Sequence, residues 1–216
     1  MAHNGDGTFD DLSDPTILPG ILAMADCSGQ EDASQRMTDL AVDCVVALGA
    51  DVTILDLRDL DLPPYESHDD VGLPQGAYAF RQLVCAHDGF LIGLPDEDGP
   101  SPSLLLNAIA WSVCPEFGTD ATDAYAGKCA SLIAATVPTE ALERSINILT
   151  AKLTQIGILV MPQSALSGND KPEEDTRLEE TSERRMRELM NMFISTIRWA
   201  QDRSRTASGE VDDGEA

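Results

Sequence analysis

The sequence has few basic and few aromatic residues for its length. Its 14 lysines and arginines stand against 38 aspartates and glutamates, which gives a formal net charge of −24 at pH 7. A protein with this charge repels the phosphates of nucleic acids and of anionic lipids, so both are excluded as partners. The same composition is typical of adaptation to high salt, and the composition alone leaves a binding role for the acidic surface open as the alternative.

The sequence also lacks the features of a membrane or secreted protein. No apolar run approaches the roughly 20 residues that a helix needs to cross a bilayer. Residues 1–14 contain no basic segment followed by an apolar one, as a secretory signal requires. We therefore expect a cytoplasmic protein.

The five cysteines are too widely spaced to indicate a disulfide framework or a metal site. Four lie in apolar segments, where we expect buried thiols: Cys44, Cys85, Cys114 and Cys129. The fifth, Cys27, precedes a predicted helix. A helix N-terminus lowers the pKa of a thiol, whereas the neighbouring acids raise it, so a structural and a reactive thiol are both open.

The length of 216 residues suits one domain with polar ends. We predict a mobile acidic segment at 1–15, a folded domain at 16–200 and a disordered tail at 201–216. Both ends are polar and rich in small residues, which cannot bury enough apolar surface to become ordered.

Within the domain, apolar runs of strand length alternate with amphipathic patterns of helical period. Strands are predicted at 17–25, 52–55, 91–94, 129–135 and 157–161. Helices are predicted at 34–48, 75–87, 101–111, 139–156 and 175–200, the first capped by Ser34 and ended by Gly49. This alternation predicts a three-layer α/β/α sandwich around a five-stranded parallel sheet, for which the order 2-1-3-4-5 is a common solution.

The stretch from Phe90 to Trp111 combines the end of a strand, an acidic loop and the start of a helix. Such a loop lies at the ligand-binding edge of an open α/β sheet. Four carboxylates should meet at this edge: Asp26 after the first strand, and Asp96, Glu97 and Asp98 after the third. They predict either a site for Ca²⁺ or Mg²⁺ or a solvated acidic rim, and the sequence has no Asp-x-Asp-x-Asp-Gly calcium loop.

Three passages resemble one known family. They are LDLRDLDLPPY at 55–65, AGKCASLIAA at 126–135, and the spaced set Pro95, Gly99, Pro102, Asn107 and Trp111. On these residues the chain resembles, from about Pro19 to Met161, the flavodoxin-like NADPH-dependent FMN reductase family.

The resemblance implies a flavodoxin-like flavoprotein with FMN and NADPH as cofactors. It implies hydride transfer from NAD(P)H via FMN to a small-molecule acceptor such as a flavin or quinone, and assembly into a homodimer or homotetramer. The positions that match the two FMN loops are Ser28, Gly29, Gln30, Ser34 and Arg36, then Pro95, Asp96, Glu97, Asp98 and Gly99. Because the flavin supplies the chemistry, no catalytic acid or base and no metal ligand is assigned.

Several loop positions depart from the family pattern. Glu31 stands where the family has an arginine, Arg36 where it has an asparagine, and Glu97 where it has a tyrosine; residues 136–140 replace a glycine-rich loop. A like charge about 4 Å from a phosphate costs on the order of 4 kcal/mol at an effective dielectric of about 20. A helix N-terminus contributes only about 0.3–1 kcal/mol, and up to about 2 when partly buried. The alternative function is therefore a homologue that has lost FMN and acts as a binding or interaction protein.

Two further positions are candidates for the site. His68 lies in the loop after the second strand without a Ser or Cys partner in the sequence, which favours a surface histidine over a catalytic one. Asn107 and Trp111 lie one turn apart on a predicted helix. The crevice, a subunit interface and the core are all open as their surroundings.

Overall fold

The computed structural model describes residues 18–25, 33–65, 72–94, 102–118, 120–134, 139–161, 164–165 and 176–208. A parallel sheet forms the middle layer, in the order β2-β1-β3-β4-β5. Its strands are β1 (Gly20–Ala25), β2 (Asp51–Asp56), β3 (Gly89–Gly93), β4 (Cys129–Ala134), β5 (Leu159–Val160) and β6 (Ser164–Ala165). The predicted fold class and strand order are confirmed.

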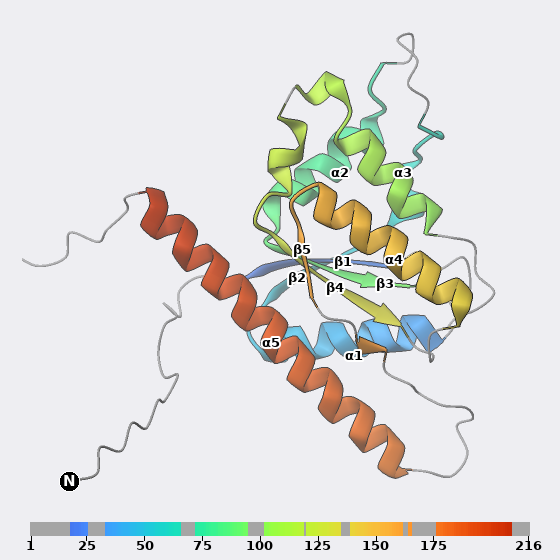
Figure 1. Ribbon diagram of the computed structural model, residues 1–216, viewed down its shortest axis with the longest axis vertical. Coiled ribbons are helices and arrows are strands. Elements are labelled where there is room, and N and C mark those ends of the chain that lie inside the picture. The colour runs from blue at the N-terminus through green and yellow to red at the C-terminus, as the bar shows by residue number, and fades with distance from the viewer. Residues whose placement is uncertain are drawn as a thin grey trace, which may run out of the picture.

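Helices cover both faces of the sheet (Figure 1). One face carries α1 (Ala33–Ala47) and α5 (Thr176–Ser208), and the other carries α2 (Gln75–Ala86), α3 (Ser103–Ser112) and α4 (Glu140–Gln155). One short 3-10 helix, η1 (Leu57–Leu60), follows β2. Two more, η2 (Pro115–Phe117) and η3 (Ala121–Ala124), follow α3.

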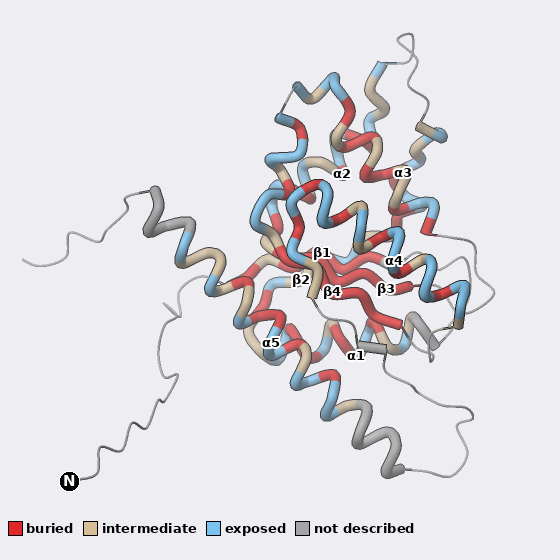
Figure 2. The backbone as a smooth tube through the Cα atoms, in the orientation of Figure 1, coloured by how far each residue is buried: buried red, intermediate tan, exposed pale blue. Residues whose placement is uncertain are grey.

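The sheet separates two apolar cores. Successive side chains of a strand point to opposite faces, so Leu22 and Met24 of β1 pack toward α2, α3 and α4, whereas Ile21 and Ala23 pack toward α1 and α5. Strands β3 and β4 are buried along their whole length, as Figure 2 shows. A strand covered on both faces needs a continuous apolar run, which is why the sequence predicted these strands well.

The outermost position of the sheet is divided between β5 and β6. Cys129 pairs with Leu159, a difference of 30 residues, whereas Ile133 pairs with Ser164, a difference of 31. The outer side therefore has one extra residue between the two pieces, as in a β-bulge. The strand predicted at 157–161 is shorter in the structure, where β5 is Leu159–Val160. The sequence did not predict β6, because Pro162 stands between the two pieces and proline argues against a continuous strand.

Two predicted helix boundaries differ from the structure. Ser34, the predicted cap, lies inside α1, which begins at Ala33. Helix α5 continues to Ser208, so residues 201–208, predicted as part of the disordered tail, are helical. The first residue that breaks helices after Pro172 is Gly209, and nothing before it stops the helix. Segments 1–15 and 209–216 lie outside the described residues.

The predicted end of α1 is confirmed. Gly49 has φ +81°, and its N–H donates to the carbonyl oxygen of Val46 at 2.9 Å. The N–H of Ala50 donates to the carbonyl oxygen of Val45 at 3.0 Å, so the chain turns sharply into β2. Glycine adopts the left-handed backbone conformation at little energetic cost, because it has no Cβ.

The cysteine prediction is right for three residues and wrong for one. Cys44, Cys114 and Cys129 are buried free thiols, whereas Cys85 is exposed. Cys85 follows the buried Val84 on α2, and one residue rotates a helical side chain by about 100°, which here places it toward solvent. Cys27 lies outside the described residues.

Candidate functional site

The carboxyl ends of β1, β3 and β4 lie side by side at one edge of the sheet. Ala25 is paired with Gly93, and Gly93 with Ile133. The chain leaves β1 for α1 on one face and β3 for α3 on the other, so the strand order reverses between β1 and β3. Helices α1, α3 and α4 all begin at this edge (Figure 1). A ligand site in an open α/β sheet lies at such a reversal, so this edge is the candidate site.

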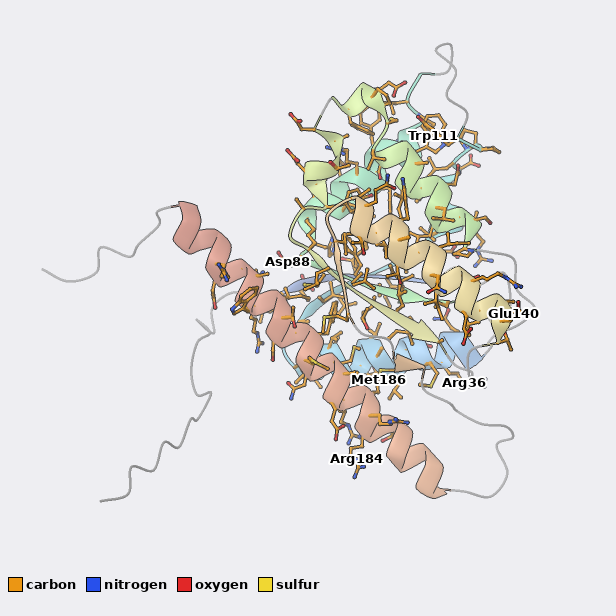
Figure 3. The ribbon with its side chains drawn as sticks, viewed as in Figure 1. Arg36, Asp88, Trp111, Glu140, Arg184 and Met186 are labelled. Carbon is orange, nitrogen blue, oxygen red and sulfur yellow. The ribbon has the colours of Figure 1, made fainter. Side chains whose placement is uncertain are left out.

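Most residues predicted for the two FMN loops follow these strand ends but lie outside the described residues. They are Ser28, Gly29, Gln30, Pro95, Asp96, Glu97, Asp98 and Gly99. Asp26, Glu31 and His68 also lie outside them. The backbone of Ser34 lies in the first turn of α1, and Arg36 is exposed on that helix (Figure 3).

The three helices that begin at this edge differ in charge. The first turns of α1 and α3 contain no acidic residue. Helix α4 begins with Glu140 and Glu143, and the Thr139 hydroxyl oxygen accepts a hydrogen bond from the N–H of Leu142 at 3.3 Å. Free N–H groups and the helix dipole favour an anion at a helix start. The starts of α1 and α3 are therefore better suited to a phosphate than that of α4.

A cleft of about 170 Å³ opens beside this edge, between α1 and the outer strand β2. Its floor includes Ala23 and Ile54, and Ile54 is 71% exposed because α1 lies mainly over the central strands. On its polar wall, Arg58 Nη2 lies 2.6 Å from Asp56 Oδ2. Hydrogen bonds from Arg58 hold the pKa of the Asp56 carboxyl below its usual value. The residue pattern of β2 did not predict this cleft, because the cleft depends on which strands α1 covers.

Asn107 and Trp111 of α3 both contact the segment that follows η1, and Trp111 is buried there. Asn107 Oδ1 accepts from the N–H of Tyr65 at 2.7 Å, and its Nδ2 donates to the carbonyl oxygen of Pro63 at 2.9 Å. Trp111 Nε1 donates to the same carbonyl oxygen at 2.7 Å, and its ring meets that of Tyr65 edge to face, with centroids 5.1 Å apart. Both residues therefore hold the proline-rich segment after η1 against α3.

Lys128, in the Gly-Lys pair before β4, holds the end of a helix. Its Nζ donates to the carbonyl oxygens of Val84 at 2.6 Å, Cys85 at 3.3 Å and His87 at 2.5 Å. These carbonyls belong to the last turn of α2, where a cation is favourable. Burial lowers the pKa of Lys128. The family-like Gly-Lys passage therefore has a structural role at the opposite edge from the candidate site.

Within the described ranges, no three His, Cys, Asp or Glu side chains are grouped so that they could hold a metal ion. The acidic residues predicted for a cation site lie outside those ranges. Among the described helices, none combines the length and the apolarity needed to span a bilayer.

Comparisons with known proteins agree with this fold. A model of the NADPH-dependent FMN reductase family matches residues 21–172. The flavoenzyme NAD(P)H:(acceptor) oxidoreductase FerB from Paracoccus denitrificans superposes with a TM-score of 0.64 at 16% identity, over 85% of this chain and 99% of FerB. RosB, solved with bound 8-demethyl-8-formylriboflavin-5'-phosphate, superposes with a TM-score of 0.62 at 15% identity, over 92% of this chain and 90% of RosB.

An NAD(P)H:quinone oxidoreductase from Methanothermobacter marburgensis gives a TM-score of 0.59 at 13% identity, over 81% of this chain and 98% of that one. No curated protein sequence matches the chain. Structural similarity at such low sequence identity shows a shared fold only. Membership of the family follows from the match of the family model.

Proposed function

Because the chain belongs to the NADPH-dependent FMN reductase family, we propose that it is an NAD(P)H-dependent oxidoreductase that binds FMN at the carboxyl edge of its sheet. The observation that carries the proposal is the match over residues 21–172, which covers β3 and all of β1 except Gly20, the two strands that flank the reversal. Bound FMN would accept a hydride from NAD(P)H and pass electrons to a flavin or quinone.

The described residues at this edge fit the phosphate of FMN in one respect. The first turn of α1 contains no acidic residue and ends with Arg36, and the N-terminus of a helix favours a nearby anion. The starts of α1 and α3 flank the ends of the paired strands β1 and β3. We assign Ser34 and Arg36 to the phosphate side and Pro95–Gly99 to the flavin ring.

The acidic loop residues set how tightly FMN binds. Glu31, Asp96, Glu97 and Asp98 add negative charge where the cofactor's phosphate and ring would lie. Salt screens exposed charges, with a Debye length of about 10 Å at 0.1 M and about 3 Å at 1 M. We therefore propose that FMN binding strengthens as salt rises, the reverse of the usual behaviour of an anionic ligand at a basic site.

The test is a titration with FMN at low and at molar salt, followed by quenching of flavin fluorescence. We expect binding that is at least tenfold tighter at molar salt, and NADPH oxidation in the presence of a flavin or quinone acceptor. The variant Glu31→Arg with Glu97→Tyr should bind FMN more tightly at low salt. The control is Asp123→Arg. Asp123 is an exposed residue on η3, and its replacement changes the net charge by the same amount as Glu31→Arg.

The second candidate function is a binding protein without flavin, favoured by the acidic substitutions in both loops. Absence of FMN binding at either salt supports this candidate and contradicts the enzyme. If the double variant also fails to bind, the loss has a cause other than Glu31 and Glu97.

A further inference from the structure

The cleft between α1 and β2 is separate from the place assigned to FMN. Its floor includes Ala23 and Ile54, which are paired in neighbouring strands. Ala23 is paired on its other side with Leu91 of β3, so β1 lies between the cleft and the reversal that flanks β3. A ligand in the cleft would therefore lie beside the proposed cofactor site and not inside it.

The floor of the cleft is apolar and open to solvent. Ile54 lies on the same face of the sheet as its partner Ala23, the face that α1 covers. Ala23 is 1% exposed, whereas Ile54 is 71% exposed. Val42 of α1 lines the same cleft. Because removing apolar surface from water is favourable, Ile54 offers a ligand an apolar contact that the protein itself does not use.

The volume of the cleft limits the size of its ligand. The cleft measures about 170 Å³, and an apolar cavity of about 150 Å³ holds one benzene molecule. Sites for drug-sized ligands are larger, at roughly 300–1,000 Å³. The cleft therefore has room for one ring with a short substituent, and a dinucleotide or a flavin is too large for it.

The charged residues that line the cleft carry one net negative charge. They are Asp39, Asp56 and Arg58. Arg58 binds the Asp56 carboxylate through two nitrogens, with Nε 2.9 Å from Oδ1 and Nη2 2.6 Å from Oδ2, so these two charges compensate each other. In the part of the chain that the structure describes, no ion pair involves Asp39. Asp39 therefore supplies the charge that a ligand in the cleft would meet.

A neighbouring amide orients the Asp39 carboxylate. Gln35 lies one turn earlier on α1 and also lines the cleft, and its Nε2 donates to Asp39 Oδ1 at 2.9 Å. A carboxylate can accept several hydrogen bonds, and an ammonium group donates three. Because the donor from Gln35 is neutral, the carboxylate keeps its charge for a cationic ligand.

We propose that this cleft binds a small protonated primary amine whose apolar body is about one ring in size. The ring lies on Ile54 and Val42, and the ammonium group donates to the carboxylate of Asp39. The net charge of −24 also concentrates cations near the protein and depletes anions. An anion of the same shape would find the charge of Arg58 already compensated by Asp56, which favours the amine.

The test is an NMR titration of the full chain with three probes that share one phenyl ring: phenethylammonium, phenethyl alcohol and phenylpropionate. We expect phenethylammonium to shift the backbone amides of Thr38, Val42 and Ile54 saturably. Its dissociation constant should be millimolar, as for other ligands of about nine non-hydrogen atoms. At low salt it should bind about tenfold tighter than the alcohol, and phenylpropionate should bind more weakly than both. Molar salt should reduce these differences, because it screens exposed charges.

Two substitutions separate the charged contact from the apolar one. Asp39→Asn should remove the preference for the ammonium ion over the alcohol. Asp43→Asn is its matched control, because Asp43 is an exposed acid one turn further along α1 that does not line the cleft. Ile54→Ser should weaken the binding of both phenethylammonium and the alcohol at least about threefold. Leu159→Ser, at a residue that is 53% exposed on β5, is the control for the lost apolar side chain. Circular dichroism checks that each variant is folded.

Phenethylammonium that causes no saturable shift at the cleft, or that binds on another surface, overturns the proposal. Equal affinities for phenethylammonium and phenylpropionate at low salt contradict the role of the Asp39 charge. If Asp39→Asn and Asp43→Asn weaken binding equally, the attraction comes from the general acidity of the protein and the cleft is not a specific site. These outcomes do not depend on whether the protein binds FMN, so the proposed function can fail without affecting this test.

Discussion

The carboxamide of Asn107 accepts a hydrogen bond from the backbone N–H of Tyr65 at 2.7 Å, across 42 residues of sequence. The same side chain donates to the carbonyl oxygen of Pro63. The consecutive prolines of this segment lack N–H groups and cannot form regular structure, so its polar groups need partners from elsewhere. Asn107 supplies two of them from one position on α3.

Replacing Asn107 with alanine should destabilise the protein by about 1–3 kcal/mol, because it leaves the partly buried N–H of Tyr65 without its acceptor. Urea unfolding followed by circular dichroism measures the change. Asn147→Ala, at an exposed position of α4, is the control and should stay within about 0.5 kcal/mol. Equal effects of the two changes would show that the contact contributes nothing.

Gly76→Ala should destabilise the protein strongly. A Cβ at this position would lie 1.9 Å from the carbonyl oxygen of Leu60, so α2 would have to move away from η1. Forcing atoms into a packed region costs about 1–3 kcal/mol, and more where backbone must move. Gly72→Ala is the matched control, because its Cβ would meet no described atom within 4 Å. Thermal unfolding of both variants tests the difference, and a Gly76→Ala protein as stable as Gly72→Ala would contradict it.

Lys128→Met should cost about 2–3 kcal/mol of stability at neutral pH, because it removes the charged donor from three carbonyl oxygens at the end of α2. Hydrogen exchange should also show faster opening of the last turn of α2. Lys152→Met, on α4, is a control of the same chemistry. Unchanged exchange in α2 would rule out the capping role.

The same lysine predicts a difference at alkaline pH. Burial lowers the folded-state pKa of Lys128 from 10.5, so the unfolded chain binds more protons between the two values. The cost of burying the charge is present below the folded pKa and is relieved as pH rises toward 10.5. The stability gap between wild type and Lys128→Met should therefore widen in favour of wild type across this window, as measured by urea unfolding at several pH values. If the stability difference between wild type and Lys128→Met narrows instead, folding raises the pKa of Lys128 and the prediction is wrong.

Thiol reactivity should separate Cys85 from three other cysteines. Burial raises the pKa of Cys44, and raises those of Cys114 and Cys129 to about 11, so little thiolate is present there at pH 8. Iodoacetamide labelling mapped by peptide mass spectrometry should modify Cys85 quickly and the other three only on unfolding. Labelling of Cys129 at the rate of Cys85 would contradict the burial.

Local patterns predicted the fold because each strand and helix has one face that must be buried. Leu142, Ile146, Leu149 and Leu153 recur at helical spacing and are all buried on α4, as predicted. The order of the sheet followed because right-handed crossovers leave few alternatives. The predicted end of a helix was wrong where polar residues continue it, as in α5 beyond Ala200.

Long-range contacts could not be predicted in the same way. Nothing local to Lys128 indicates that it reaches the carbonyls of α2, and nothing local to Asn107 indicates Pro63 as its partner. The cleft beside Ile54 depends on where α1 crosses the sheet. Of the candidate site, the sequence predicted the edge and the strands that form it, whereas the loop positions that would hold FMN stay predictions.

The division of the outer strand affects how molecules of this protein meet in concentrated solution. An unbroken edge strand is a template on which a foreign strand can add, the first step toward fibres. Here the free edge is two pieces of two residues each, displaced by one position. At the other edge, β2 begins and ends with aspartate, whose charges repel an identical strand. Both borders of the sheet thus discourage open-ended growth by strand addition.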